Sequence, residues 1–176
     1  FKSNAGLDTL SCNLSPVPIG CNSKPGLVYM GSPASGLADP KISNPLATPD
    51  KTTTYVLTTN HDGGGCFNKD TVVVTASIID SSLRLSGDAM FCSTSGDSAI
   101  LHVQPTTKIQ WFKDNRLITG SAGVDYRVTR SGTYRALLVN NDCCTVATKH
   151  LPIIISVLTP GLRSPVVSAV IAFPLA

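Results

Sequence analysis

The sequence predicts an all-β protein made of two tandem antiparallel β-sandwiches followed by an extended C-terminal strand. The 176-residue chain contains eleven Asp, no Glu and only two Gln. Side chains that favour helices are therefore scarce, whereas the β-favouring Thr and Val are abundant. Twelve Pro and fourteen Gly supply the turns that many short strands require. Segments with apolar residues at every second position recur along the chain, which is typical of half-buried strands.

The first predicted unit covers residues 1–79. We expect strands around residues 18–20, 27–30, 53–59 and 71–75. In the last of these, Val72 and Val74 lie on one face because successive strand side chains alternate. The stretch "HDGGGCFNKD" before it is predicted to be a Gly-rich hairpin turn.

The second predicted unit covers residues 80–158. Its segments "SAILHV", "KIQWFKDNRL" and "DYRVTRSGTYRALLVNN" alternate like strands, with a turn at Asp114 and Asn115. The residues expected to face inward are Ala99, Leu101, Val103, Ile109, Trp111, Tyr134, Ala136 and Leu138. The joint "ASIIDSSLRL" is short and partly apolar, which favours stacked units over freely jointed ones.

The tail, residues 159–176, belongs to neither unit. Five residues of its alternating apolar pattern share one face, namely Val167, Ala169, Ile171, Phe173 and Leu175. Such a face has to be buried somewhere. Two interpretations remain open: a last strand packed on its own domain, or a strand donated to a neighbouring molecule.

The chain contains six cysteines: Cys12, Cys21, Cys66, Cys92, Cys143 and Cys144. No CxxC pair and no Cys/His cluster with zinc-ligand spacing occurs, so we expect no metal and no cofactor. Six Cys in a Thr-rich β protein favour disulfides, and hence an extracellular or cell-surface location. Because the first residue is Phe1, we interpret the chain as a mature or truncated form.

Several function classes lack support in the sequence. The net charge of +3 is small, and the Arg residues of the second half are spread out rather than clustered with aromatic residues, so nucleic-acid binding is not expected. The sequence contains no apolar run of 18 residues, so we expect no membrane span. The three His residues stand apart, and neither HExxH nor GxSxG occurs, so we expect no enzyme.

Residues 12–157 resemble the PKD-like and Ig-like repeat modules of secreted Bacteroidetes surface proteins, which are associated with gliding motility and linked to type IX secretion. In the first unit the resemblance rests on residues 32–37, Asp39-Pro40, Asn44-Pro45, Pro49, 52–55, Cys66 and 70–75. In the second it rests on Phe91-Cys92, 96–98, 110–114, 131–134 and one of Cys143 and Cys144. Gly31 stands where the family usually has Trp, which predicts a less well filled first core.

The resemblance also implies disulfides and sugar attachment. The family pattern pairs an early Cys with a late turn Cys, which implies Cys12–Cys66 and Cys92–Cys144. We hypothesise that the leftover Cys21 and Cys143 bond to each other, between the units or between molecules; the alternative is two inert thiols. Three short segments resemble the O-glycosylation signal of exported Bacteroidetes proteins, at Thr9, Thr71 and Ser98.

These observations predict a non-catalytic structural protein of the cell exterior, as a subunit or segment of a bacterial surface filament or adhesin. Its expected partners are copies of itself, joined head to tail through the C-terminal strand, or neighbouring repeats. The alternative is an accessory module of a larger secreted protein that binds carbohydrate, such as surface glycans, or protein. A carbohydrate site usually requires exposed aromatic side chains. The single Trp, Trp111, is predicted to point inward, which counts against this alternative.

Overall fold

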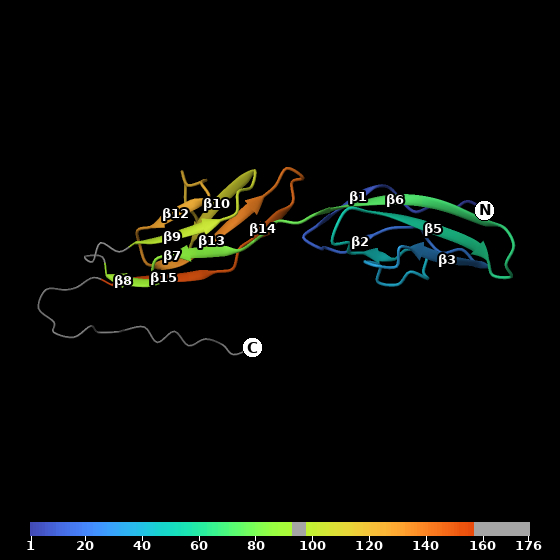
Figure 1. Cartoon of the computed structure of the whole chain (residues 1–176), viewed down its shortest axis with the longest axis horizontal. Coiled ribbons are helices and arrows are strands. Elements are labelled where there is room, and N and C mark those ends of the chain that lie inside the picture. Colours follow the sequence, from blue (N-terminus) through green and yellow to red (C-terminus); the bar gives the residue numbers. More distant parts are fainter. Residues whose placement is uncertain (93–97, 157–176) are drawn as a thin grey trace, which may run out of the picture.

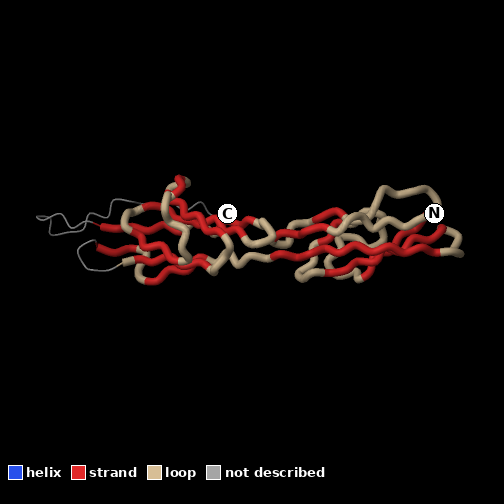
Figure 2. Tube along the Cα trace, turned by 90° about the horizontal axis from the view of Figure 1, so that it is seen from above, coloured by secondary structure: helices blue, strands red, loops and turns tan. Residues whose placement is uncertain are grey.

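The computed structural model describes residues 1–92 and 98–156. Fifteen strands and no helix lie in this part of the chain. They form two units placed end to end along the long axis of the molecule (Figure 1, Figure 2). The prediction of an all-β fold with two tandem Ig-like sandwiches is therefore confirmed, whereas the predicted tail strand falls outside the described residues.

The first unit contains a four-stranded and a two-stranded sheet. The larger sheet has the order β1-β6-β5-β3, in which β1 pairs with β6 in parallel and the other pairs are antiparallel. The smaller sheet pairs β2 with β4. The bounds are β1 (Thr9–Cys12), β2 (Val17–Pro18), β3 (Leu27–Ser32), β4 (Leu46–Ala47), β5 (Thr53–His61) and β6 (Phe67–Ser77).

The hairpin of β5 and β6 forms the centre of this unit. Tyr55, Leu57 and Thr59 are buried, and the residues between them reach the outer face, as the alternating pattern predicts. The two strands are longer than expected, so the Gly-rich turn shrinks to residues 62–66. This turn lies at the end of the molecule farthest from the second unit (Figure 1).

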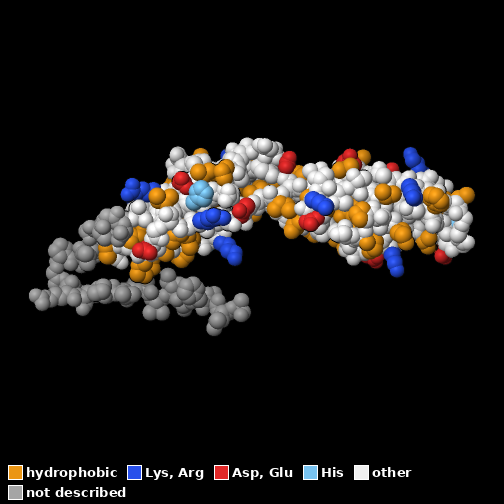
Figure 3. Space-filling view, in the orientation of Figure 1, with side chains coloured by type: hydrophobic (Ala, Val, Ile, Leu, Met, Phe, Trp, Pro, Cys, Tyr) orange, Lys and Arg blue, Asp and Glu red, His pale blue; other side chains and the backbone are white. Residues whose placement is uncertain are grey.

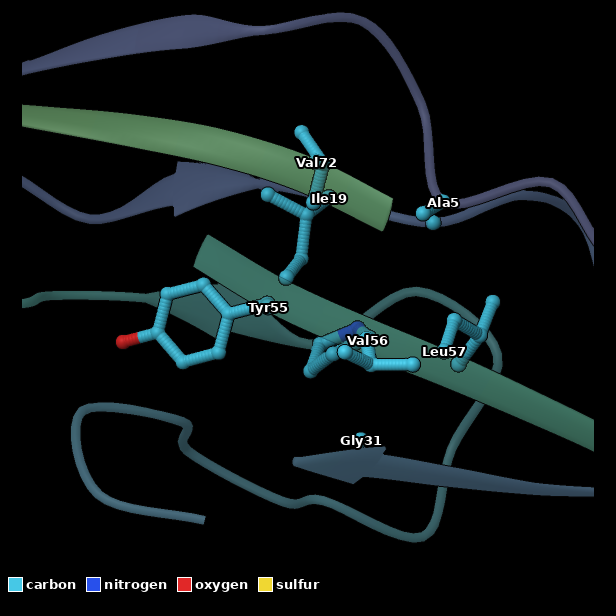
Figure 4. A pocket seen from close by; sticks show the side chains of 9 residues that line it. Ala5, Ile19, Gly31, Tyr55, Val56, Leu57 and Val72 are labelled. Carbon is cyan, nitrogen blue, oxygen red and sulfur yellow. The ribbon is translucent and has the colours of Figure 1, made fainter. Parts of the chain in front are cut away.

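A small cavity lies in the first core. Figure 4 shows Ile19, which follows β2, together with residues of β5 and Val72 of β6 around this cavity, beside Gly31 of β3. Its volume is about 10 Å³, close to the space that one water needs. A Cβ at Gly31 would lie 2.7 Å from Leu37 Cδ1. Leu37 thus occupies part of the space beside Gly31, and a small cavity remains there.

The second unit is a fuller sandwich of a three-stranded and a six-stranded sheet. The smaller sheet has the order β12-β9-β7; the larger has the order β11-β10-β13-β15-β8, with β14 also paired to β13. The bounds are β7 (Leu83–Ser86), β8 (Met90–Cys92), β9 (Ala99–Val103), β10 (Lys108–Lys113), β11 (Arg116–Leu117), β12 (Asp125–Val128), β13 (Gly132–Val139), β14 (Thr145–Ala147) and β15 (Leu151–Ser156).

The core of the second unit carries two features of Ig-like domains. Trp111 of β10 is fully buried, and its Nε1 donates a hydrogen bond to the Gly123 carbonyl at 2.9 Å. The Tyr134 hydroxyl donates to the Arg130 carbonyl at 2.5 Å, which matches the tyrosine corner at the start of the corresponding Ig strand. Burial, above all, raises the pKa of Tyr134 to about 12.

Each residue expected to face inward in the second unit is buried. Asp114 and Asn115 have φ angles of 49° and 63°, as a tight two-residue hairpin turn requires. Ile79 belongs to the second core although it ends the first predicted unit. The division between residues 79 and 80 stays a prediction.

Candidate functional site at the joint between the units

The two units are covalently linked where they meet. A disulfide joins Cys12, the last residue of β1, to Cys144 in the loop between β13 and β14. Their Cα atoms are 5.5 Å apart and the residues are separated by 132 positions. A loop of that length corresponds to about 5 kcal/mol of stabilisation in the chain-entropy model. The bond therefore joins the two units through residues that are far in sequence from the segment that links β6 to β7.

Hydrogen bonds reinforce the same joint. Asn140 Nδ2 donates to Ser77 Oγ at 2.6 Å, and Ser77 Oγ donates to Asp142 Oδ2 at 2.6 Å. Asn13, which follows Cys12, accepts a hydrogen bond at Oδ1 from the Ile79 amide at 2.9 Å, and its Nδ2 donates to the Thr145 carbonyl at 3.3 Å. The joint is thus held by side chains from both units.

Two turns place these groups. Asn140 Oδ1 accepts hydrogen bonds from the amides of Asp142 and Cys144, each at 3.1 Å, so a single side chain shapes the loop that carries Cys144. Cys143 adopts a φ of 61°, and Asn13 a φ of 51°. These left-handed positions favour Asn, which accounts for Asn at position 13. We call the set Cys12, Asn13, Ser77, Asn140 and Cys144 the clamp.

The disulfides implied by the resemblance, Cys12–Cys66 and Cys92–Cys144, are wrong. Cys12 lies beside Ser77 at the joint, whereas Cys66 directly precedes the start of β6. The eleven residues of β6 span roughly 35 Å at the rise of an extended strand. No disulfide reaches that far. Cys144 is already bonded to Cys12, which excludes its pairing with Cys92.

The remaining pairing hypothesis is excluded within one chain, because Cys21 and Cys143 are both thiols in the structure. Cys143 is exposed, whereas the neighbouring Cys144 is buried. A bond between Cys21 and Cys143 of two molecules stays a prediction.

The three sites proposed for O-glycosylation have different exposures. Thr71 is exposed, whereas Thr9 and Ser98 are half-buried. The aspartates that precede the two threonines have structural roles: Asp8 Oδ1 accepts from the Val73 amide, and Asp70 Oδ2 from the Ala5 amide, both at 2.8 Å. Sugar attachment stays a prediction.

The described residues include no group of three or more His, Cys, Asp or Glu side chains placed to hold a metal ion. In the face shown in Figure 3, Lys and Arg side chains are interspersed with Asp rather than gathered in one patch.

A search of the described residues for a helix long and apolar enough to span a membrane finds none.

The sequence analysis missed Asn13, Ser77 and Asn140. The available signal was local: "NNDCC" places turn-forming residues directly before two cysteines, and Asn13 directly follows Cys12. The packing of the two units decides which strand ends meet at the joint. The contacts between residues there therefore could not be predicted from the spacing of residues along the sequence.

Fold and joint together define a protein of two covalently clamped Ig-like β-sandwiches. No family model and no curated protein matches the chain. Among solved structures it is similar to the N-terminal four Ig domains of Dscam1. Isoform 7.44 is 14% identical with a TM-score of 0.38, covering 88% of this chain and 46% of that one.

Isoform 4.44 is also 14% identical, with a TM-score of 0.39 and the same two coverages. Isoform 9.44 is 15% identical with a TM-score of 0.37, covering 89% of this chain and 47% of that one. The chain thus spans less than half the length of these structures. At these values the likeness says nothing about function.

Proposed function

We propose that the chain is a non-catalytic, rigid two-unit rod of the cell exterior, a subunit or segment of a bacterial surface filament or adhesin. The observation that carries this proposal is the clamp. A disulfide and hydrogen bonds from side chains of both units hold the two sandwiches as one body. Binding modules in tandem commonly keep a mobile linker, whereas a rod that has to transmit force benefits from a fixed joint.

The location follows from the same bond. Disulfides persist in oxidising compartments and are rare in the cytosol. The resemblance to repeat modules of secreted Bacteroidetes surface proteins agrees with this location, and the three O-glycosylation signals would fit that origin.

Assembly is the finer part of the proposal. The chain leaves β15 at the end of the second unit, beside β8, and the hairpin of β5 and β6 lies at the opposite end of the molecule (Figure 1). In a head-to-tail arrangement, the apolar residues 165–176 of one copy reach the first unit of the next. An open contact of this kind generates a fibre rather than a closed oligomer.

Electron microscopy of the native protein, with and without reducing agent, tests the proposal. Regular fibres with a repeat of about one two-unit rod support it, and deletion of residues 165–176 is expected to leave folded monomers. Polymers that survive the deletion contradict the donated strand. Monodisperse two-bead particles at all concentrations contradict self-assembly.

The alternative is an accessory module that binds carbohydrate or protein. A carbohydrate site commonly uses exposed aromatic side chains, but Trp111 is fully buried. The most exposed aromatic residue in the described part is Phe67, which lies on a strand without an aromatic neighbour on its face. Specific binding on a glycan array would favour this alternative.

A further inference from the structure

The outer face of the first unit's large sheet carries an apolar patch near the hairpin end. Val28 and Met30 of β3 are 45% and 59% exposed, and Phe67 of β6 is 63% exposed. Strand pairing places Val28, Asn60 and Phe67 in one row and Met30, Thr58 and Lys69 in the next. A shallow groove runs over these residues. We call Val28, Met30, Thr58, Asn60 and Phe67 the tip patch.

One polar atom in the tip patch lacks a partner. Asn60 Oδ1 is buried and has no hydrogen-bond donor among the described residues. A buried acceptor without a donor is destabilising, because it has lost its hydrogen bonds to water. Asn60 lies between Val28 and Phe67 in its row, so a backbone N–H of an extended segment laid over the patch could become its donor after a small side-chain shift.

A second tip patch is a poor occupant. Lys41 and Lys69 line the same groove, and two copies stacked face to face would bring these ammonium groups together. The patch therefore suits a narrow, uncharged, apolar occupant such as one extended strand.

Residues 164–176 of this chain fit that description. They contain no charged side chain, and Val167, Ala169, Ile171, Phe173 and Leu175 alternate with smaller residues. The strand β15 lies toward one end of the long axis, whereas the turn between β5 and β6 lies at the other end (Figure 1). A tail has to run back along both units to reach its own patch, but the patch of the next copy is adjacent in a head-to-tail row.

We propose that the tip patch is the docking site for residues 167–175 of the neighbouring copy. This inference rests on the proposed head-to-tail assembly and adds the acceptor surface to it. The apolar side chains of the tail cover Val28, Met30 and Phe67, and the exposed apolar area of these three side chains is removed from water.

Contact occurs on the face of the sheet rather than along the full edge of β3. At one end of this edge the Gly31 amide donates to the Pro40 carbonyl at 2.6 Å, and at the other the Leu27 amide donates to the Lys24 carbonyl at 3.3 Å. Because both ends are already paired, a long added strand has no continuous edge to extend.

Substitutions in the full chain test the docking site. Met30→Gln and Phe67→Ser, separately and together, remove apolar area from exposed positions without opening the core. Ile78→Gln is the matched control, since Ile78 is 54% exposed and lies at the joint, away from both ends. Sedimentation velocity over a concentration series measures association. The double variant is expected to weaken association at least tenfold, and Ile78→Gln less than twofold.

Cross-linking locates the tail directly. Cys66 is exposed and directly precedes Phe67, so Ser168→Cys and Ala176→Cys place a thiol near one or the other end of a docked tail. A disulfide-linked ladder on a non-reducing gel, lost with Cys66→Ser, is the expected result. If the new cysteine instead bonds to Cys66 of the same chain and no ladder forms, docking between copies is overturned.

The outcomes separate this inference from the proposed assembly. If polymers persist after deletion of residues 165–176, the donated strand itself is wrong. A different result would exclude only the tip patch. In that case polymers require residues 165–176, Met30→Gln and Phe67→Ser leave association unchanged, and no tail cysteine bonds to Cys66. Head-to-tail assembly would then stand, but the tip patch would not be the acceptor of the tail.

Discussion

Asn140 Nδ2 lies 2.6 Å from Ser77 Oγ, although 63 residues separate the two in sequence. Ser77 ends the last strand of the first unit, and Asn140 begins the loop that carries Cys144 in the second. The same asparagine therefore orders the cysteine loop and holds it against the neighbouring unit. The orientation of the units depends on this side chain as well as on the disulfide.

Replacement of this side chain is expected to loosen the joint. Asn140→Ala removes one hydrogen bond to Ser77 and two that its Oδ1 accepts, so the free energy of unfolding falls by roughly 2 kcal/mol. Urea denaturation measures this change. The control is Asn141→Ala, because the Asn141 side chain accepts an exposed hydrogen bond from Thr107 and makes no other among the described residues. Equal losses in the two variants would contradict a special role for Asn140.

Two glycines of the first core are expected to respond differently to alanine. At Gly20, with φ of 87°, a Cβ would lie 2.0 Å from the Ser43 carbonyl oxygen. Backbone cannot yield cheaply, so Gly20→Ala destabilises by at least about 2 kcal/mol.

At Gly31 the Cβ meets the flexible end of Leu37 beside a small cavity. Gly31→Ala therefore changes the unfolding free energy by less than about 1 kcal/mol. Thermal melts of both variants check the contrast, and a larger loss at Gly31 than at Gly20 would refute this description of the core.

Alkaline pH is expected to destabilise the fold through Tyr134. Its pKa is raised, mainly by burial, to about 12 from an ordinary value of 10.0. A group with a raised folded-state pKa stabilises fully below its unfolded pKa, and that contribution is lost as pH rises through the folded one. The unfolding free energy therefore falls between about pH 10 and 12.

Tyr134→Phe is the matched variant for this pH dependence. It loses the hydrogen bond to the Arg130 carbonyl, so it is less stable at pH 7, by about 1 kcal/mol. Between pH 10 and 12 the free energy of unfolding of this variant falls less than that of the wild type. The fall that remains comes from Tyr55, because burial also raises the pKa of Tyr55. Parallel stability curves for the two proteins would exclude Tyr134 as the cause.

The covalent pairing can be read by mass spectrometry of a non-reducing digest. A peptide pair containing Cys12 and Cys144 is expected, together with Cys66 as a thiol that reacts with alkylating agents. A Cys12–Cys66 pair would restore the pairing implied by the resemblance and remove the clamp.

The strands could be predicted from the sequence because their signal is local. Val72 and Val74, or Leu101 and Val103, alternate with half-buried or exposed neighbours, and that period survives without knowledge of any partner strand. The Asp114-Asn115 turn is equally local, since only a few residue types tolerate positive φ.

The joint could not be predicted in the same way. The pairing of Cys12 with Cys144 depends on how two folded units pack. The resemblance to repeat modules implied pairs within each unit instead. Local alternation does not reveal which strand ends meet at the joint, so the sequence placed Ser77 only within the short link between the units.

Small-angle X-ray scattering of the oxidised monomer tests the central claim most directly, with the Cys12→Ser/Cys144→Ser variant as comparison and residues 165–176 deleted in both. A single rigid rod is expected for the oxidised protein, with a scattering curve that the structure alone fits. The variant is expected to require an ensemble of inter-unit angles. If the oxidised protein also requires a broad ensemble, the two units are freely jointed and the rigid-rod account is wrong.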